Sequence, residues 1–305
     1  MGKIAFLFAG QGAQYPGMGK DLYELGGGPA EIFDIMEKER PGTLQDCFTA
    51  TPERLTHTSV TQPCVYTVSL ACAMALVEKG ILPEAAAGFS LGEMAALAFA
   101  GTFSLQLGAR LTCRRGSLME ETTTATPGAM AAVLRLSDED VETLCKKFEN
   151  IWPVNYNCPG QLVVAGSAEE MPSFILAVKE QGGMAKALPV GGAFHTPFMA
   201  QASASFAEEL DTIQFISTHI PVYANLTARP YASSYKETLA SQMRNPVLWQ
   251  STITHMQEDG FDTFVELGPG KTLSGFVKRI IPEARIHNVE NAETLNATVQ
   301  ALSAI

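Results

Sequence analysis

The sequence lacks the cysteine and histidine patterns of disulfide-rich and metal-binding proteins. Its 305 residues include six cysteines, and none of them forms a Cys-x-x-Cys pair or has a histidine at metal-ligand spacing. Scattered thiols of this kind are typical of a reducing compartment. We therefore expect no disulfide framework and no metal site.

Long apolar runs and positive charge are also scarce. No apolar run reaches the roughly 18 residues that a bilayer span requires, and the N-terminal segment has no signal-peptide cleavage site. The formal net charge of −11 argues against nucleic acid and anionic membranes as partners. No coiled coil or apolar seam indicates an oligomer. These absences predict a cytoplasmic protein that acts as a monomer.

A glycine-rich loop at residues 9–19 follows a predicted buried strand at 3–9. It has neither the Gly-Lys-Ser/Thr ending of a P-loop nor a Gly-x-Gly-x-x-Gly pattern, so nucleotide binding is not expected. Gln11 and Gln14 could offer backbone and amide donors to a ligand. The alternative is a simple turn.

The segment from Gly88 to Gly92 has the pattern Gly-x-Ser-x-Gly between a short apolar strand and a helix. Ser90 would then lie on a tight turn at a helix start, with its hydroxyl pushed outward. The first free helical N–H groups, beginning at Leu91, would point at negative charge forming beside Ser90. This arrangement suits an acyl-transferring nucleophile. The alternative is a glycine-rich turn with an N-capping serine.

A serine nucleophile needs a base, and His195 is the best candidate because small residues, an aromatic residue and a proline hold its turn. No carboxylate is evident as a third triad member. Asp138 and Asp140 lie between Ser90 and His195, but capping of a helix explains them. A backbone carbonyl could orient the histidine instead. A Ser–His dyad is the simpler interpretation.

Arg115 is the second candidate for binding. On a predicted helix after Ser104 it has Leu111, Leu118 and Met119 at neighbouring positions, which draws it toward the apolar face. An arginine in such surroundings needs an anionic partner. The alternative is that it snorkels to the surface.

After a predicted linker at 122–127, the pattern changes to strand–helix–strand–strand–helix–strand, which is typical of a ferredoxin-like unit. We expect a subdomain at 127–190 inserted into a larger α/β core formed by 1–126 and 191–305.

Seven motifs occur in an order that resembles the malonyl-CoA:acyl carrier protein transacylase family of type II fatty acid synthesis and the related acyltransferase domains of polyketide synthases. They are Gly-Gln-Gly-Ala-Gln at 10–14, Gly-Phe-Ser-Leu-Gly-Glu at 88–93, Arg-Gly at 115–116, Asn-Tyr-Asn-x-Pro-Gly-Gln at 155–161, Ala-Phe-His-Thr-Pro-Phe-Met at 193–199, Asn-Pro-Val-x-Trp at 245–249 and Gly-Pro-Gly-Lys at 268–271.

The resemblance implies an α/β-hydrolase-like core with a parallel sheet, a ferredoxin-like subdomain and an active site between them. Ser90 would carry the malonyl group, and His195 would act as base and then as acid. Backbone N–H groups of Gln11 and Leu91 would form the oxyanion hole. Arg115 would pair with the malonyl carboxylate. A main-chain carbonyl near Asn245 would orient the histidine.

The resemblance also implies a substrate-binding set consisting of Gln62, Phe89, Asn155, Asn157 and Phe194 in addition to Arg115. One departure stands in this set: the family usually has histidine before the nucleophile, where this chain has Phe89. The change alters the polarity beside the acyl pocket and so bears on acyl selectivity.

The implied reaction is a ping-pong transfer of malonyl from malonyl-CoA to the phosphopantetheine thiol of acyl carrier protein, and it needs no metal or redox cofactor. Because carrier proteins and this chain are both acidic, we expect a local basic surface near the cleft, with candidates Lys186, Lys271, Lys278 and Arg279. The alternatives are an acyl-thioester hydrolase, an acyltransferase of a trans-acting polyketide pathway with altered selectivity, and a catalytically silent scaffold.

Overall fold

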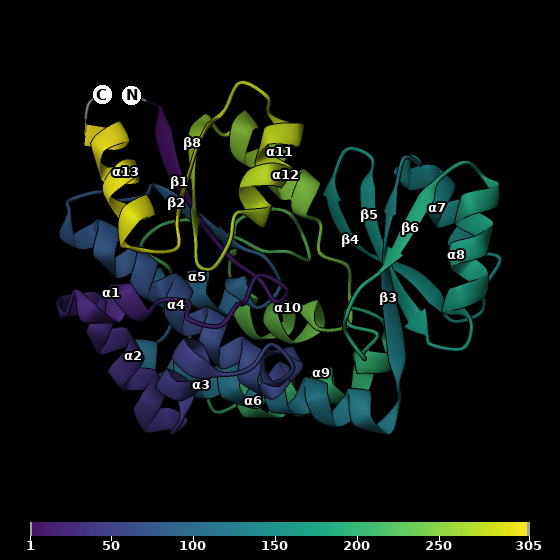
Figure 1. The fold of residues 1–305 in the computed structure, drawn as a ribbon, viewed down its shortest axis with the longest axis horizontal. Helices are drawn as coiled ribbons and strands as arrows, with labels where there is room; N and C mark the ends of the chain where they lie inside the picture. Colours follow the sequence, from purple (N-terminus) through teal and green to yellow (C-terminus); the bar gives the residue numbers. More distant parts are fainter. Residues whose placement is uncertain (1, 304–305) are drawn as a thin grey trace.

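The computed structural model describes residues 2–303 and contains two separate sheets (Figure 1). The larger sheet has five strands in the order β7-β2-β1-β8-β9, and all of its neighbouring strands are parallel. Its strands are β1 (Lys3–Phe8), β2 (Ala85–Gly88), β7 (Val222–Tyr223), β8 (Phe261–Leu267) and β9 (Arg285–Val289). The first predicted strand and the parallel α/β core are thus confirmed.

Both faces of the parallel sheet are covered, because alternate residues of β1 enter different cores. Phe6 and Phe8 pack with the long helices on one face, whereas Ala5 and Leu7 pack with α11 and α12 on the other. The helical elements of this part are α1 (Lys20–Glu24), α2 (Gly27–Glu39), α3 (Thr43–Thr49), η1 (Arg54–Thr56), α4 (Thr58–Glu78), α5 (Gly92–Phe99), α6 (Leu105–Ala125), η2 (Pro197–Met199), α9 (Ala200–Leu210), α10 (Tyr235–Gln242), α11 (Trp249–Glu258), α12 (Thr272–Ile280) and α13 (Ala292–Ser303).

Helix α4 departs from the expectation that no segment could span a bilayer. It is long and apolar enough to do so by length and composition, because its Thr and Ser residues interrupt the apolar run without lowering the mean hydropathy much. In this structure 89% of its most apolar stretch is buried inside the protein. Helix α4 is therefore the central core helix beneath the parallel sheet.

The smaller sheet is antiparallel, with strand order β4-β5-β3-β6 and two helices beside it, as predicted for a ferredoxin-like unit (Figure 1). Its elements are β3 (Gly128–Leu134), α7 (Asp138–Cys145), β4 (Ile151–Cys158), β5 (Gln161–Ser167), α8 (Met171–Glu180) and β6 (Met184–Ala187). Asp140 forms the predicted capping box with Ser137 at the start of α7. The proposed division at residues 127 and 190 encloses all of these elements.

The predicted linker at 122–127 is wrong, because α6 continues to Ala125. The hydroxyl of Thr122 donates to the carbonyl of Leu118, and those of Thr123 and Thr124 donate to the carbonyl of Glu120. These bonds satisfy the hydroxyls inside the helix, so the threonines do not end it. Only two residues separate α6 from β3.

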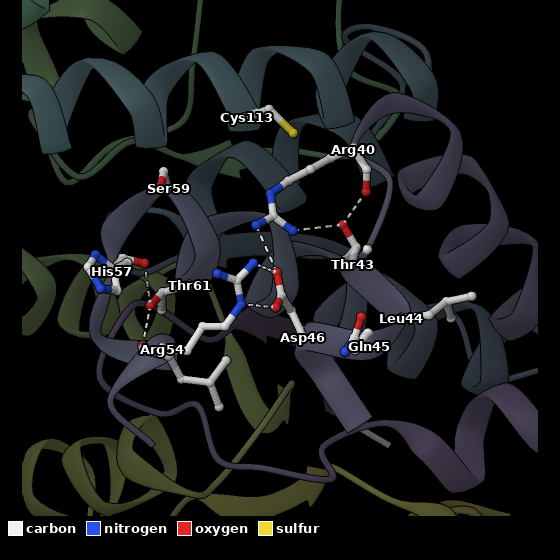
Figure 2. A network of polar contacts seen from close by, with 12 residues as sticks. Arg40, Thr43, Leu44, Gln45, Asp46, Arg54, His57, Ser59, Thr61 and Cys113 are labelled. Carbon is white, nitrogen blue, oxygen red and sulfur yellow. Dashed lines mark hydrogen bonds and ion pairs between the residues drawn. The ribbon is translucent and has the colours of Figure 1, made fainter. Parts of the chain in front are cut away.

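An ion-pair network around the buried carboxylate of Asp46 ties α3 to η1 (Figure 2). The Asp46 carboxylate accepts from Nε and Nη2 of Arg54, the latter at 3.0 Å, and lies 2.8 Å from Nη2 of Arg40. Burial alone would raise the pKa of Asp46, but the hydrogen bonds from Arg54 and Arg40 outweigh it and hold the pKa below its ordinary value.

Replacing Asp46 by alanine should lower the free energy of unfolding by about 3 kcal/mol, because it leaves two arginines without their carboxylate. Arg54 is half-exposed, so water can take up part of its charge, and the loss should lie at the lower end for a broken buried pair. Urea unfolding measures it. Glu24→Gln, which removes an exposed ion pair with Lys20, is the control and should leave the midpoint unchanged. Equal midpoints for the two variants would contradict the prediction.

Candidate active site

The turn that carries Ser90 joins the end of β2 to the start of α5, and its glycines have no room for side chains. A Cβ on Gly88 would lie 2.0 Å from the carbonyl carbon of Gly92, and one on Gly92 would lie 2.1 Å from the carbonyl oxygen of Phe8. Ser90 itself has a φ of 52°, in the left-handed region that non-glycine residues rarely adopt. The predicted sharp strand-to-helix turn is therefore present.

His195 lies opposite this turn and also has a left-handed φ, of 64°. Its Nε2 is 2.8 Å from the Oγ of Ser90. Its Nδ1 lies 2.9 Å from the carbonyl oxygen of Gln242 and 3.2 Å from that of Asn245. Because carbonyl oxygens only accept, Nδ1 carries the proton and Nε2 is free to accept from Ser90. The carbonyl predicted near Asn245 is thus a pair of carbonyls, with Gln242 the nearer.

The His195 imidazole is held in its neutral form. Burial, and next the positive charge of Arg115, lower its pKa to about 4, against the opposing effect of the two carbonyls. At neutral pH the side chain is therefore a neutral acceptor for the Ser90 proton.

Arg115 lies on α6 and is fully buried, so the surface alternative considered above does not apply. Its Nη1 donates to Oε1 of Gln62 at 2.8 Å, and its Nη2 donates to Oε1 of Gln242 at 2.8 Å and to Oγ of Ser90 at 3.2 Å. All three acceptors are neutral. Among the described residues, no carboxylate lies within hydrogen-bonding distance of this guanidinium.

A buried arginine without a carboxylate partner is costly. Burial lowers the pKa of Arg115 to about 10, and the charge of Glu93 opposes this shift only from farther away. The group is still cationic at neutral pH. The site therefore presents a desolvated positive charge beside Ser90, ready for an anion that enters from outside.

The backbone N–H groups predicted for the oxyanion hole are free in the structure. Within residues 2–303, neither the amide of Gln11 nor that of Leu91 has a hydrogen-bond acceptor. The Ser90 amide, by contrast, donates to Oδ1 of Asn225 at 2.6 Å. The amide available next to Ser90 Oγ is thus that of Leu91.

Ser90 and His195 line a cavity of about 540 Å³. It extends from the parallel-sheet core to Leu188, Pro189 and Val190, which follow β6. Five residues of the predicted oxyanion hole and substrate-binding set also line it: Gln11, Gln62, Phe89, Asn155 and Phe194. The other lining residues are Gly12, Gln14, Tyr15, Pro16, Pro52, Leu55, Thr56, Met119, Met130, Leu188, Pro189 and Val190. Asn157 is buried on β4 but does not line the cavity, so it is not brought to the site.

Phe89 lines the cavity on one side and packs into the core on the other. Its ring lies 5.4 Å from that of Trp249, edge to face, and 6.3 Å from that of Phe276. These contacts with α11 and α12 hold an apolar wall next to the nucleophile.

Sequence reasoning missed Gln242 and Asn225. Gln242 accepts from Arg115 through Oε1, donates to the carbonyl of Ser90 through Nε2 at 2.8 Å, and orients His195 through its own carbonyl. Asn225 follows β7, and the carboxyl end of a parallel strand is where such sheets place site residues. That position is the signal that could have found it.

The four candidates for a basic surface differ in their surroundings. Lys186 and Lys271 are exposed. Lys278 donates to the carbonyl of Pro282 at 2.5 Å. Arg279 donates to Gln161 at 2.9 Å and to the carbonyl of Pro159 at 2.7 Å, so it ties α12 to the turn between β4 and β5.

The site and the comparison with known proteins together define an acyl transferase. The model of the acyl transferase domain family matches residues 5–298. The malonyl CoA-acyl carrier protein transacylase of Bacillus subtilis is 36% identical, over 99% of this chain and 98% of its own. A Clostridium perfringens structure of that name superposes with a TM-score of 0.95 at 35% identity, covering 99% and 98% of the two chains.

A third similar protein, a malonyl-transacylase solved in complex with a type II polyketide synthase acyl carrier protein, has a TM-score of 0.94 at 31% identity, covering 98% of this chain and 99% of its own. This chain belongs to the malonyl CoA-acyl carrier protein transacylase family.

Proposed function

We propose that this enzyme moves a malonyl group from malonyl-CoA to the phosphopantetheine thiol of acyl carrier protein through a malonyl-Ser90 intermediate. The observation that carries the proposal is the meeting of the Ser90 hydroxyl with His195 and with a buried, carboxylate-free Arg115, next to a cavity that Ser90 and His195 line. Family membership supports the same activity, and a relative's complex with a carrier protein supports the partner.

In the first half-reaction, Ser90 Oγ attacks the thioester carbonyl of malonyl-CoA while its proton passes to Nε2 of His195. The carbonyl oxygen becomes an oxyanion that the amides of Gln11 and Leu91 would stabilise. The C–S bond then breaks, and the imidazolium returns the proton to the departing CoA sulfur. Malonyl-Ser90 and free CoA result.

In the second half-reaction, the phosphopantetheine thiol enters the site that CoA has left. Neutral His195 takes the thiol proton, the sulfur attacks the ester carbonyl, and the C–O bond to Ser90 breaks. The proton goes to Ser90 Oγ, which restores the free enzyme. Two substrates that use one cavity in turn give ping-pong kinetics.

The choice of acyl group rests on Arg115. Before acylation, one N–H of Nη2 is occupied by Ser90 Oγ at 3.2 Å. When Oγ becomes an ester oxygen, it is a poorer acceptor, so this N–H is released beside the acyl chain. A malonyl carboxylate would then supply the missing anionic partner, whereas an acetyl group would leave the cation unpaired.

Fatty acid synthesis in the cytoplasm is the role we propose, with the enzyme acting as a monomer. The carrier protein would approach the cavity mouth, and exposed Lys186 and Lys271 are the candidates for contact with its acidic surface. No metal or redox group takes part in the proposed steps.

Intact-mass spectrometry after mixing with malonyl-CoA, acetyl-CoA or methylmalonyl-CoA in separate tubes tests the proposal. We expect one malonyl group on the chain from malonyl-CoA, and no adduct when Ser90 is replaced by alanine. Added acyl carrier protein should then remove the group and carry it.

Other outcomes would contradict this function. An adduct from acetyl-CoA or methylmalonyl-CoA alone would indicate a different acyl specificity. Free malonate without carrier protein would indicate a hydrolase. The absence of both an adduct and free acid would indicate a catalytically silent scaffold.

A further inference from the structure

The backbone of Ser90 is strained, and the side chain of Asn225 spans the strained turn. Asn225 Nδ2 donates to the carbonyl oxygen of Gly88 at 2.6 Å, and its Oδ1 accepts from the amide of Ser90 at 2.6 Å. One fully buried amide therefore binds the chain on both sides of Phe89. Left-handed φ values at non-glycine residues persist only where the surroundings enforce them, and these two bonds do so.

Asn225 is itself held by a buried carboxylate. Its backbone amide donates to Oε2 of Glu93 at 2.7 Å, and its carbonyl accepts from the amide of Leu248 at 3.0 Å. The other oxygen of Glu93 accepts from the hydroxyl of Tyr231. Glu93 thus connects the first turn of α5 to the segment after β7, although neither it nor Tyr231 lines the cavity.

The Asn225 bond to Ser90 also decides which amide of the turn is left without a partner. With its own N–H engaged by Asn225 and its carbonyl bound by Gln242 at 2.8 Å, Ser90 is held at both ends. The next amide, that of Leu91, stays without an acceptor among the described residues. If the Asn225 bond were lost, the Ser90 amide would become a buried unpaired donor, and the turn could rotate to satisfy it.

We propose that Asn225 is a positioning residue, supported by Glu93, which fixes the Ser90 turn so that the hydroxyl faces His195 and the Leu91 amide faces the oxyanion. Asn225 touches no reacting atom and acts through the backbone of Ser90. The inference rests on the proposed function only insofar as Ser90 is a nucleophile, and it does not depend on which acyl group is carried.

A test independent of the acyl donor is labelling of Ser90 by a small fluorophosphonate. In that reaction Oγ forms a bond to phosphorus, fluoride leaves, and the serine proton passes to His195. We expect Asn225→Ala to lower the labelling rate about 100-fold, comparable to removal of one oxyanion-hole donor. Asn150→Ala is the control, since it removes an amide that bonds Glu170 at 3.0 Å in the antiparallel-sheet part, and it should label at the wild-type rate.

Asn225→Asp distinguishes positioning from a loss of folding. Its carboxyl group can accept from Ser90, but it can donate to the Gly88 carbonyl only when protonated. Burial raises the pKa of such a group, as it raises the pKa of the neighbouring Glu93 to about 7. Because Glu93 titrates in both variants, the labelling rate of Asn225→Asp is compared with that of Asn225→Ala, and this ratio should rise as the pH falls from about 8 to about 5.5.

The proposal would be overturned if Asn225→Ala were labelled at the wild-type rate. It would also be overturned if the relative labelling rate of a folded Asn225→Asp did not change with pH, or if the wild-type chain took no label. The malonyl-CoA experiment is read separately. A wild-type malonyl adduct with unaffected Asn225→Ala labelling refutes the positioning role alone. Slow Asn225→Ala labelling without any wild-type malonyl adduct refutes the proposed function alone.

Discussion

His195→Ala should slow the formation of malonyl-Ser90 by about 10³- to 10⁴-fold, because it removes the group that takes the Ser90 proton. Rapid-quench intact-mass measurement gives the rate. His255→Ala is a matched control: that imidazole also bonds a backbone carbonyl, of Ala228 at 2.7 Å, but it lies on α11 away from the cavity. The control should react at the wild-type rate. A similar loss in both variants would show that His195 is not the base.

The same histidine predicts a wide pH range. Because burial and Arg115 lower its pKa to about 4, kcat/KM for acylation should be level from about pH 8 to about pH 5.5 and then fall, approaching tenfold per unit below its pKa. An acid limb with a midpoint at the ordinary histidine value would contradict this environment.

The shift also has a consequence for stability. The pKa of His195 is lower in the folded than in the unfolded chain, so unfolded molecules bind the proton first as the pH falls. The stability due to neutral His195 is thus present above its ordinary pKa and is lost as the pH falls toward about 4. Activity in the acid limb should be measured in short incubations, with circular dichroism to confirm that the chain is folded.

Local patterns in the sequence were sufficient for the parts of the site that depend on short segments. The glycines on either side of Ser90 predict its turn because no side chain fits there, and the structure has that turn. The apolar neighbours of Arg115 predict its burial, and it is buried. Both features depend only on residues close to one another in the chain, so the spacing of those residues is enough to predict them.

The residues that sequence reasoning missed act across long distances in the chain. Asn225 follows the two-residue strand β7, and its partner Ser90 lies 135 positions away in the chain. The bonds from His195 go to main-chain carbonyls, which every residue has, so no side chain marks them. The linker error has a different cause: threonine hydroxyls found acceptors inside α6, which composition does not reveal.

Arg115→Met should reduce the rate of acylation by malonyl-CoA by about 10³-fold while leaving acylation by acetyl-CoA unchanged or faster. Methionine keeps most of the buried volume of the arginine stem but removes the charge and the donors. The malonyl carboxylate then enters an apolar site without a partner, which is the costly case, whereas an acetyl group no longer meets an unpaired cation. Parallel acylation rates with the two thioesters measure the change in preference.

Arg114→Ala is the matched control for that variant. Arg114 is the preceding residue on α6, but it is partly exposed and bonds Glu209 at 3.0 Å on the surface, so its loss should leave both rates unchanged.

The Arg115→Met variant has a second readout. Removing the Arg115 charge removes one of the two causes that lower the pKa of His195, so the acid limb should move to higher pH. A malonyl rate that falls without a change in acyl preference would mean that Arg115 supports the site without binding the carboxylate.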